Sequence, residues 1–259
     1  MSFFPYASHQ IYYESCGTGE PLILLHGNTA SSRMFDPIIP MLAGKYRVIA
    51  MDFLGCGRSD HLASWPSDLW YEWARQVRAL CEHLGLSEVY LIGTSGGALA
   101  AINAALEYSQ LVRAAAADSF AGINADPSVT NDIQAGRTQA KHIEGFRAYL
   151  RFLHGEDWEQ VFDADTDAII RHAREIGAYF HRPLSELRLP LLLTGSEEDE
   201  MFPPGHYQQL FQKICQETRR AEKHIFPHGG HPAIMSNMED FAALLDRLID
   251  DDTERSSNV

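Results

Sequence analysis

Residues 93–97 read Gly-Thr-Ser-Gly-Gly and lie between an apolar run, 89–92, and the helix-forming run 98–104. A turn from a buried strand into a helix over so few residues holds its central residue in a strained backbone conformation. Side chains two positions before and after that residue would clash, and the chain has Gly93 and Gly97 there. The pattern therefore predicts that Ser95 projects its hydroxyl into a cleft as a nucleophile. Gly96 begins the helix, where free backbone N–H groups can stabilise an oxyanion.

Short apolar runs alternate with segments of helical periodicity along most of the chain. Strands are predicted at 10–15, 22–25, 46–51, 89–92, 112–117, 189–194 and 222–226, and helices at 34–42, 69–84, 96–104, 207–215 and 241–249. This alternation predicts an α/β fold, a doubly wound and mostly parallel sheet with helices on both faces. It stops for about seventy residues after Asp118. We therefore expect a core of residues 1–118 and 189–259, with 119–188 inserted as a helical cap.

Charge and composition exclude several classes of protein. The formal net charge of −14 argues against a nucleic-acid partner, which requires a basic surface. Part of the acid lies in the tail Asp250–Asp252, expected to be solvated and frayed. The four cysteines lack metal-ligand spacing, and the N-terminus lacks the pattern of a secretory signal. We expect a reduced, cytoplasmic protein without a membrane span.

A serine nucleophile needs a base within hydrogen-bond reach and a carboxylate that orients the base. His231 lies in a glycine-rich loop after the last predicted strand, and Asp199 follows the strand before it. The carboxyl ends of parallel strands share one edge of a sheet, so these side chains can converge with Ser95. His228 is a spare histidine, but a metal pair with His231 would lack a third ligand at recognisable spacing, and no metal is expected.

Four segments together resemble the α/β-hydrolase superfamily: His26–Thr29, Asp52–Ser59, Gly93–Gly97 and Gly230-His231. The resemblance implies an α/β-hydrolase fold with Ser95 as nucleophile, His231 as base and Asp199 as orienting acid. It also implies an oxyanion hole formed by the backbone N–H groups of Asn28 and Gly96, and no cofactor.

The chain departs from the family pattern at the acid. Members usually carry it three residues after the glycine of this loop, which is Glu198 here, whereas Asp199 comes fourth. Asp199 is favoured by its spacing to Pro203, and Glu198 and the strand-end Asp118 remain the alternatives. His26-Gly27-Asn28 is similar to the loop of haloalkane dehalogenases, in which the asparagine side chain faces the halide. Those enzymes use an aspartate nucleophile, and Ser95 argues against that activity.

These features predict a serine hydrolase that cleaves a small or medium carboxylic ester, a small-molecule substrate, through an acyl-enzyme. The main alternatives are hydrolysis of a carbon–carbon bond in a diketone and a slow-turnover ligand receptor on the same fold, and a lyase or a cofactor-free perhydrolase also remains open. His26 is expected to brace the oxyanion loop. Candidates for an acyl pocket are Phe120, Phe146, Trp158 and Met201.

Overall fold

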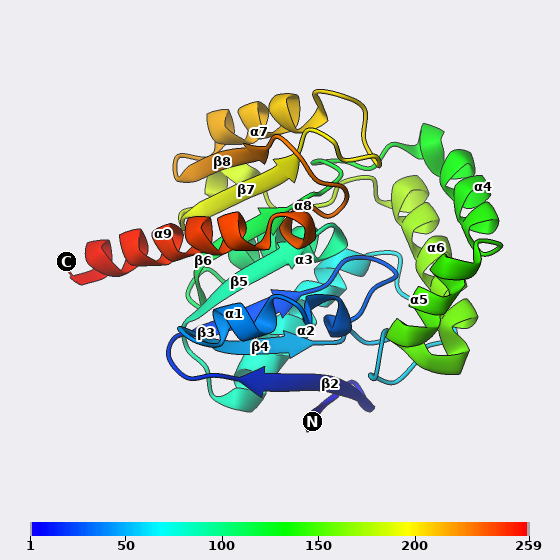
Figure 1. Ribbon diagram of the computed structural model, residues 1–259, viewed down its shortest axis with the longest axis horizontal. Helices are drawn as coiled ribbons and strands as arrows, with labels where there is room; N and C mark the ends of the chain where they lie inside the picture. Colours follow the sequence, from blue (N-terminus) through cyan, green and yellow to red (C-terminus); the bar gives the residue numbers. More distant parts are fainter. Residues whose placement is uncertain (1, 258–259) are drawn as a thin grey trace.

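The computed structural model describes residues 2–257 and has one eight-stranded sheet with helices on both faces (Figure 1). The strands run in the order β1-β2-β4-β3-β5-β6-β7-β8, and all neighbours from β4 to β8 pair in parallel. Their bounds are β1 Ser2–Tyr6, β2 His9–Cys16, β3 Pro21–Leu25, β4 Arg47–Met51, β5 Val89–Thr94, β6 Val112–Asp118, β7 Leu191–Ser196 and β8 Ala221–Phe226. The predicted fold class is confirmed.

The helices fall into a group on each face of the sheet and a group beyond one edge. Their bounds are α1 Ile39–Leu42, α2 Leu69–Leu84, α3 Gly96–Glu107, α4 Thr130–Ala140, α5 Glu144–His154, α6 Trp158–Glu175, α7 His206–Glu217, α8 Ala233–Ser236 and α9 Met238–Ser257, with 3-10 turns at Ser32–Phe35, Pro127–Val129, Gly155–Asp157 and Leu184–Glu186. Alternate residues of β3 point to opposite faces: Ile23 belongs to the apolar core on the face that carries α2, α3 and α7, and Leu24 to the core on the face that carries α1, α8 and α9. Two apolar cores therefore sandwich the sheet.

Three sequence predictions differ from the structure. The helix predicted over 34–42 is a 3-10 turn followed by the single turn α1, since Pro37 and Pro40 lack the backbone N–H that a continuous helix would use. The edge strand β1 was not predicted. The acidic tail is helical as far as Ser257, and Asp252 is buried against Arg113, with 2.9 Å between Oδ2 and Nη2. The expectation of a solvated, frayed tail was therefore wrong for this residue.

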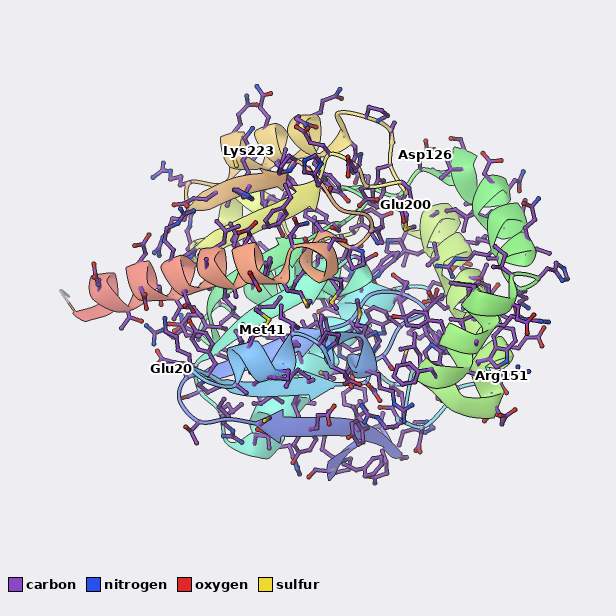
Figure 2. The ribbon with its side chains drawn as sticks, viewed as in Figure 1. Glu20, Met41, Asp126, Arg151, Glu200 and Lys223 are labelled. Atoms are coloured by element: carbon purple, nitrogen blue, oxygen red, sulfur yellow. The ribbon has the colours of Figure 1, made fainter. Side chains whose placement is uncertain are left out.

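Helices α4, α5 and α6 lie beyond the carboxyl ends of the parallel strands (Figure 1). We call residues 119–188 the helical segment. Glu200, on the loop after β7, lies on the side of the molecule that faces this segment, whereas Glu20 and Lys223 lie away from it (Figure 2). Within residues 2–257, no helix combines the length and the apolar character needed to cross a membrane.

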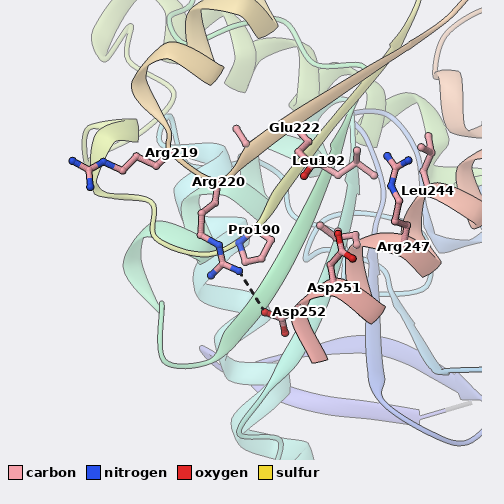
Figure 3. Close-up of a pocket in the computed structure, with 11 residues that line it drawn as sticks. Pro190, Leu192, Arg219, Arg220, Glu222, Leu244, Arg247, Asp251 and Asp252 are labelled. Atoms are coloured by element: carbon pink, nitrogen blue, oxygen red, sulfur yellow. Dashed lines mark ion pairs between the residues drawn. The ribbon is translucent and has the colours of Figure 1, made fainter. Parts of the chain in front are cut away.

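A cavity of about 160 Å³ opens at the other edge of the sheet, beside α9 (Figure 3). Its charged lining residues are Arg219, Arg220, Arg247, Glu222, Asp251 and Asp252. The two signs are balanced, and Figure 3 shows Arg220 directed at Asp252, 4.0 Å away. This cavity lies at the amino ends of β7 and β8. It is therefore remote from Ser95, Asp199 and His231, which follow the carboxyl ends of the strands.

Candidate active site

Ser95 occupies the sharp turn between β5 and α3, with φ 55° and ψ −120°. A Cβ on Gly93 would lie 2.1 Å from the carbonyl oxygen of Gly97, and one on Gly97 would lie 2.1 Å from that of Leu25. Both neighbours are backbone atoms that cannot rotate away. The strained conformation of Ser95 therefore depends on glycine at both positions.

We predict that Gly97→Ala destabilises the protein by about 3 kcal/mol or more, because the added methyl overlaps the backbone of β3. Gly145→Ala is the matched control, since nothing lies within 4 Å of a Cβ at this position in α5. Alanine there should be neutral or stabilise by up to about 1 kcal/mol. Urea unfolding of both variants measures the difference, and equal midpoints would contradict the clash.

His231 and Asp199 are in direct contact. Nδ1 of His231 lies 2.8 Å from Oδ2 of Asp199, whose side chain is 1% exposed. An ionised carboxylate only accepts hydrogen bonds, so Nδ1 carries the proton and Nε2 is left as an acceptor. Burial alone would raise the pKa of Asp199, but hydrogen bonds from His231 and from the Tyr207 hydroxyl, at 2.6 Å, outweigh it and hold that pKa below its usual value. Asp199 therefore stays ionised beside the imidazole.

The two alternative acids are bonded elsewhere. Glu198 is exposed and contacts His228 and the backbone N–H of Gly229, each at 3.2 Å. Asp118 is fully buried and accepts hydrogen bonds from two threonine hydroxyls and a backbone N–H, those of Thr94, Thr194 and Ile234. Asp118 thus fastens the ends of three strands to α8, and burial raises its pKa.

The loop after β3 packs against the serine turn. The side-chain amide of Asn28 lies so close to Gly96 that a Cβ there would be 2.0 Å from Asn28 Oδ1. His26 is fully buried. Its Nε2 accepts from the N–H of Phe53 at 3.1 Å, so Nδ1 carries the proton and donates to Gly27 O at 2.8 Å. His26 therefore braces this loop, as the sequence predicted.

A second histidine that sequence reasoning missed supports the same loop. Nδ1 of His154, the last residue of α5, accepts from the N–H of Gly57 at 2.9 Å, so Nε2 donates to Thr29 O at 3.0 Å. Thr29 has φ 57°, a left-handed conformation that is uncommon for threonine. His154 thus helps to hold a strained residue beside Asn28.

We predict that the free energy of unfolding decreases as the pH falls, because of His154. Burial lowers its pKa to about 4, since the charged ring would lose water and meet the N–H of Gly57. The unfolded chain binds this proton below about pH 6.5 and the folded chain only near pH 4, so stability falls by about 3 kcal/mol across that window. His154→Gln should be less stable than wild type at pH 7, and the gap should close towards pH 4. Urea unfolding at several pH values measures it; a gap that stays constant with pH would contradict the assignment.

Ser95 and His231 both line a cavity of about 390 Å³ under the helical segment. The other side chains lining it are Asn28, Thr29, Ala30, Met34, Arg137, Ala140, Phe146, Tyr149, Leu150, Phe162, Met201 and Pro232. Of the four predicted pocket residues, Phe146 and Met201 line this cavity, whereas Phe120 packs on Phe211 and Trp158 packs within the helical segment. Among residues 2–257, no group of three or more His, Cys, Asp and Glu side chains is arranged to hold a metal ion.

The remaining lining residues come from separate segments, among them the loop after β3, α4, α5, α6 and the loop after β8, and the sequence does not show which of their side chains face one cavity. One signal was present in α6, where Asp165 interrupts the apolar face formed by Val161, Phe162 and Ala168. A carboxylate at a core position of a helix indicates a buried polar partner.

A family model described as the alpha/beta hydrolase family matches residues 22–244. The chain belongs to the alpha/beta hydrolase family. It is 26% identical over 252 residues to a 2-hydroxy-6-oxo-6-(2'-aminophenyl)hexa-2,4-dienoic acid hydrolase of Metapseudomonas resinovorans, covering 89% of this chain and 84% of that one. A proline iminopeptidase of Clostridium botulinum is 37% identical over 115 residues, which are 41% of this chain and 38% of the peptidase.

Solved structures share the fold over almost the full length of this chain. A carboxylesterase structure from the thaumarchaeon Nitrososphaera gargenis superposes with a TM-score of 0.75 at 17% identity, covering 98% of this chain and 100% of that one. A meta-cleavage product hydrolase from Pseudomonas fluorescens IP01 gives 0.71 at 20% identity, covering 97% and 98%. The comparisons support hydrolase activity for this chain.

Proposed function

We propose that this protein is a serine hydrolase that cleaves a small or medium carboxylic ester, with Ser95, His231 and Asp199 as its catalytic triad. The observation that carries the proposal is the 2.8 Å contact between His231 and Asp199, with His231 and Ser95 lining one cavity. The expected alternatives Glu198 and Asp118 are bonded to other groups.

In this mechanism His231 Nε2 takes the Ser95 proton as Oγ attacks the ester carbonyl. The backbone N–H groups of Asn28 and Gly96 stabilise the oxyanion. His231 then returns the proton to the leaving alcohol, which departs as the acyl-enzyme forms. A water molecule, deprotonated by His231, releases the acid and regenerates the serine. No cofactor takes part.

We further propose that residues 119–188 form a cap inserted in the hydrolase core and that the cap selects the acyl group. Phe146, Tyr149 and Phe162 give the cavity an apolar wall. Among its described lining residues Arg137 carries the one permanent charge, and buried Asp165 is paired with it. The wall therefore favours an uncharged acyl group.

The test is a series of p-nitrophenyl esters from acetate to octanoate, with mono-p-nitrophenyl succinate as the charged counterpart of the butyrate. We expect sustained turnover, with kcat/KM for the butyrate at least about tenfold above that for the succinate. A burst followed by a stall would instead indicate a slow-turnover receptor.

Hydrolysis of a carbon–carbon bond is the second candidate, favoured by the similarity to a hydrolase of a dienoic acid. Arg137 could meet the carboxylate of such a substrate only in competition with Asp165. Hydrolysis of a 2-hydroxy-6-oxohexa-2,4-dienoic acid is followed by the loss of its absorbance. If the protein hydrolyses this acid faster than any of the esters, the carbon–carbon hydrolase is favoured over the esterase.

A further inference from the structure

The side chain of Asn28 is held from two directions. Its Oδ1 accepts from Trp70 Nε1 on α2 at 3.0 Å, and its Nδ2 donates to Asp165 Oδ1 on α6 at 2.6 Å. The amide therefore ties the loop after β3 both to the sheet-packed helices and to the helical segment. It cannot turn toward a ligand without losing one of these bonds.

Asp165 links that amide to the cavity wall. Its side chain is fully buried, and its second carboxylate oxygen accepts from Arg137 Nη1 on α4. Arg137 lines the cavity, contacts the Thr166 hydroxyl at 3.1 Å and lies over the ring of Phe162. A buried carboxylate is tolerated only with such partners. A continuous chain of contacts therefore runs from the apolar wall of the cavity, through Arg137 and Asp165, to Asn28 in the loop after β3.

We propose that Asp165 is a positioning residue that couples the filling of the cavity to the orientation of the oxyanion loop, by way of Asn28. This inference rests on the proposed ester hydrolysis at Ser95. An acyl chain that packs on Phe162 and Arg137 steadies Asp165, and Asp165 steadies the amide that lies over Gly96. Fixing the Asn28 side chain also fixes the backbone N–H of Asn28, which donates to the oxyanion. Longer acyl chains then increase kcat and not only affinity, because this N–H stabilises the transition state.

The first test compares Asp165→Asn with Asp163→Asn. Asp163 is also on α6 and also pairs with a cation, Lys141, which directly follows α4, at 2.5 Å. Its side chain is exposed, unlike that of Asp165. Asp165→Asn should lower kcat for p-nitrophenyl hexanoate about 10- to 100-fold with KM changed less than about threefold. The ratio of kcat for hexanoate to acetate should fall toward one. Asp163→Asn should leave both constants within about twofold.

The second test exchanges the amide of Asn28 and the carboxylate of Asp165. Asn28→Asp sets two carboxylates against each other and should lower kcat about 100-fold or more. The double variant Asn28→Asp, Asp165→Asn restores one donor and one acceptor and the original total charge, so it should regain at least about tenfold over the single variant. This comparison stands even if Asp165→Asn alone does not fold.

Each outcome has a distinct meaning. Equal kcat for wild type and Asp165→Asn, an effect on KM alone, or no recovery in the double variant would overturn the coupling. Labelling of Ser95 by a fluorophosphonate in every variant separates this result from failure of the proposed function. If the wild type neither turns over esters nor labels at Ser95, the proposed function itself fails.

Discussion

Ser95→Ala is expected to lower ester turnover by about 10⁴- to 10⁶-fold while the fold stays intact. In the proposed mechanism the serine hydroxyl is the group that forms the acyl-enzyme, and alanine has no oxygen to do so. Alanine also fits the turn, since it removes one oxygen and keeps the Cβ that Ser95 already carries at φ 55°. Initial rates with p-nitrophenyl butyrate and mass spectrometry after fluorophosphonate treatment measure the effect.

The wild-type adduct should map to the peptide that contains Ser95, and the alanine variant should give none. Thermal unfolding of the two proteins provides the control for folding. An adduct on another residue, or comparable turnover in the variant, would show that the nucleophile is wrongly assigned.

Asp199→Asn is expected to cost about 10⁴-fold in kcat. Asparagine presents an N–H or a neutral oxygen to His231 Nδ1 in place of a carboxylate that also accepts from Tyr207. The ring then loses the interaction that stabilises its protonated form in the transition state, and its tautomer is no longer imposed. Rates measured across pH, with labelling of Ser95, separate this loss from unfolding.

Two variants serve as comparisons for the acid. Glu198→Gln should change kcat by less than about tenfold, because Glu198 contacts His228 and Gly229 on the exposed side of the loop. Asp118→Asn should lower stability more than activity, since its carboxylate joins three buried hydrogen bonds. If either variant were slower than Asp199→Asn, the orienting acid would have to be reassigned.

The core of the fold follows from local patterns in the sequence. Wholly apolar runs such as Leu22–Leu25 are buried on both faces, and Gly85, at φ 64°, ends α2 where it was predicted to end. The glycines around Ser95 specify the strand-to-helix turn, because no other residue fits against the backbone at Gly93 and Gly97. These features depend on neighbours along the chain or on the single edge shared by parallel strands, so they can be derived without coordinates.

The sequence predicted the carboxylate that meets His231 only in part. Glu198, Asp199 and Glu200 are adjacent carboxylates, and which of them meets His231 depends on how the loop after β7 turns. The structure brings Asp199 inward to His231 and Tyr207, while Glu198 and Glu200 contact the backbone of the histidine loop at Gly229 and His231. A difference of one position along a loop is decided by tertiary packing.

The sequence by itself determined the layered fold, the turn at Ser95 and the convergence of residues that follow strand ends. Only the tertiary structure decided most of the cavity wall beyond Phe146 and Met201, and the contacts of Asn28 with Trp70 and Asp165, which come from helices far apart in the chain. The physical reason is the range of the interactions. Strand burial and glycine turns are set within a few residues, whereas a buried amide or carboxylate is specified by partners that only folding brings within hydrogen-bond distance.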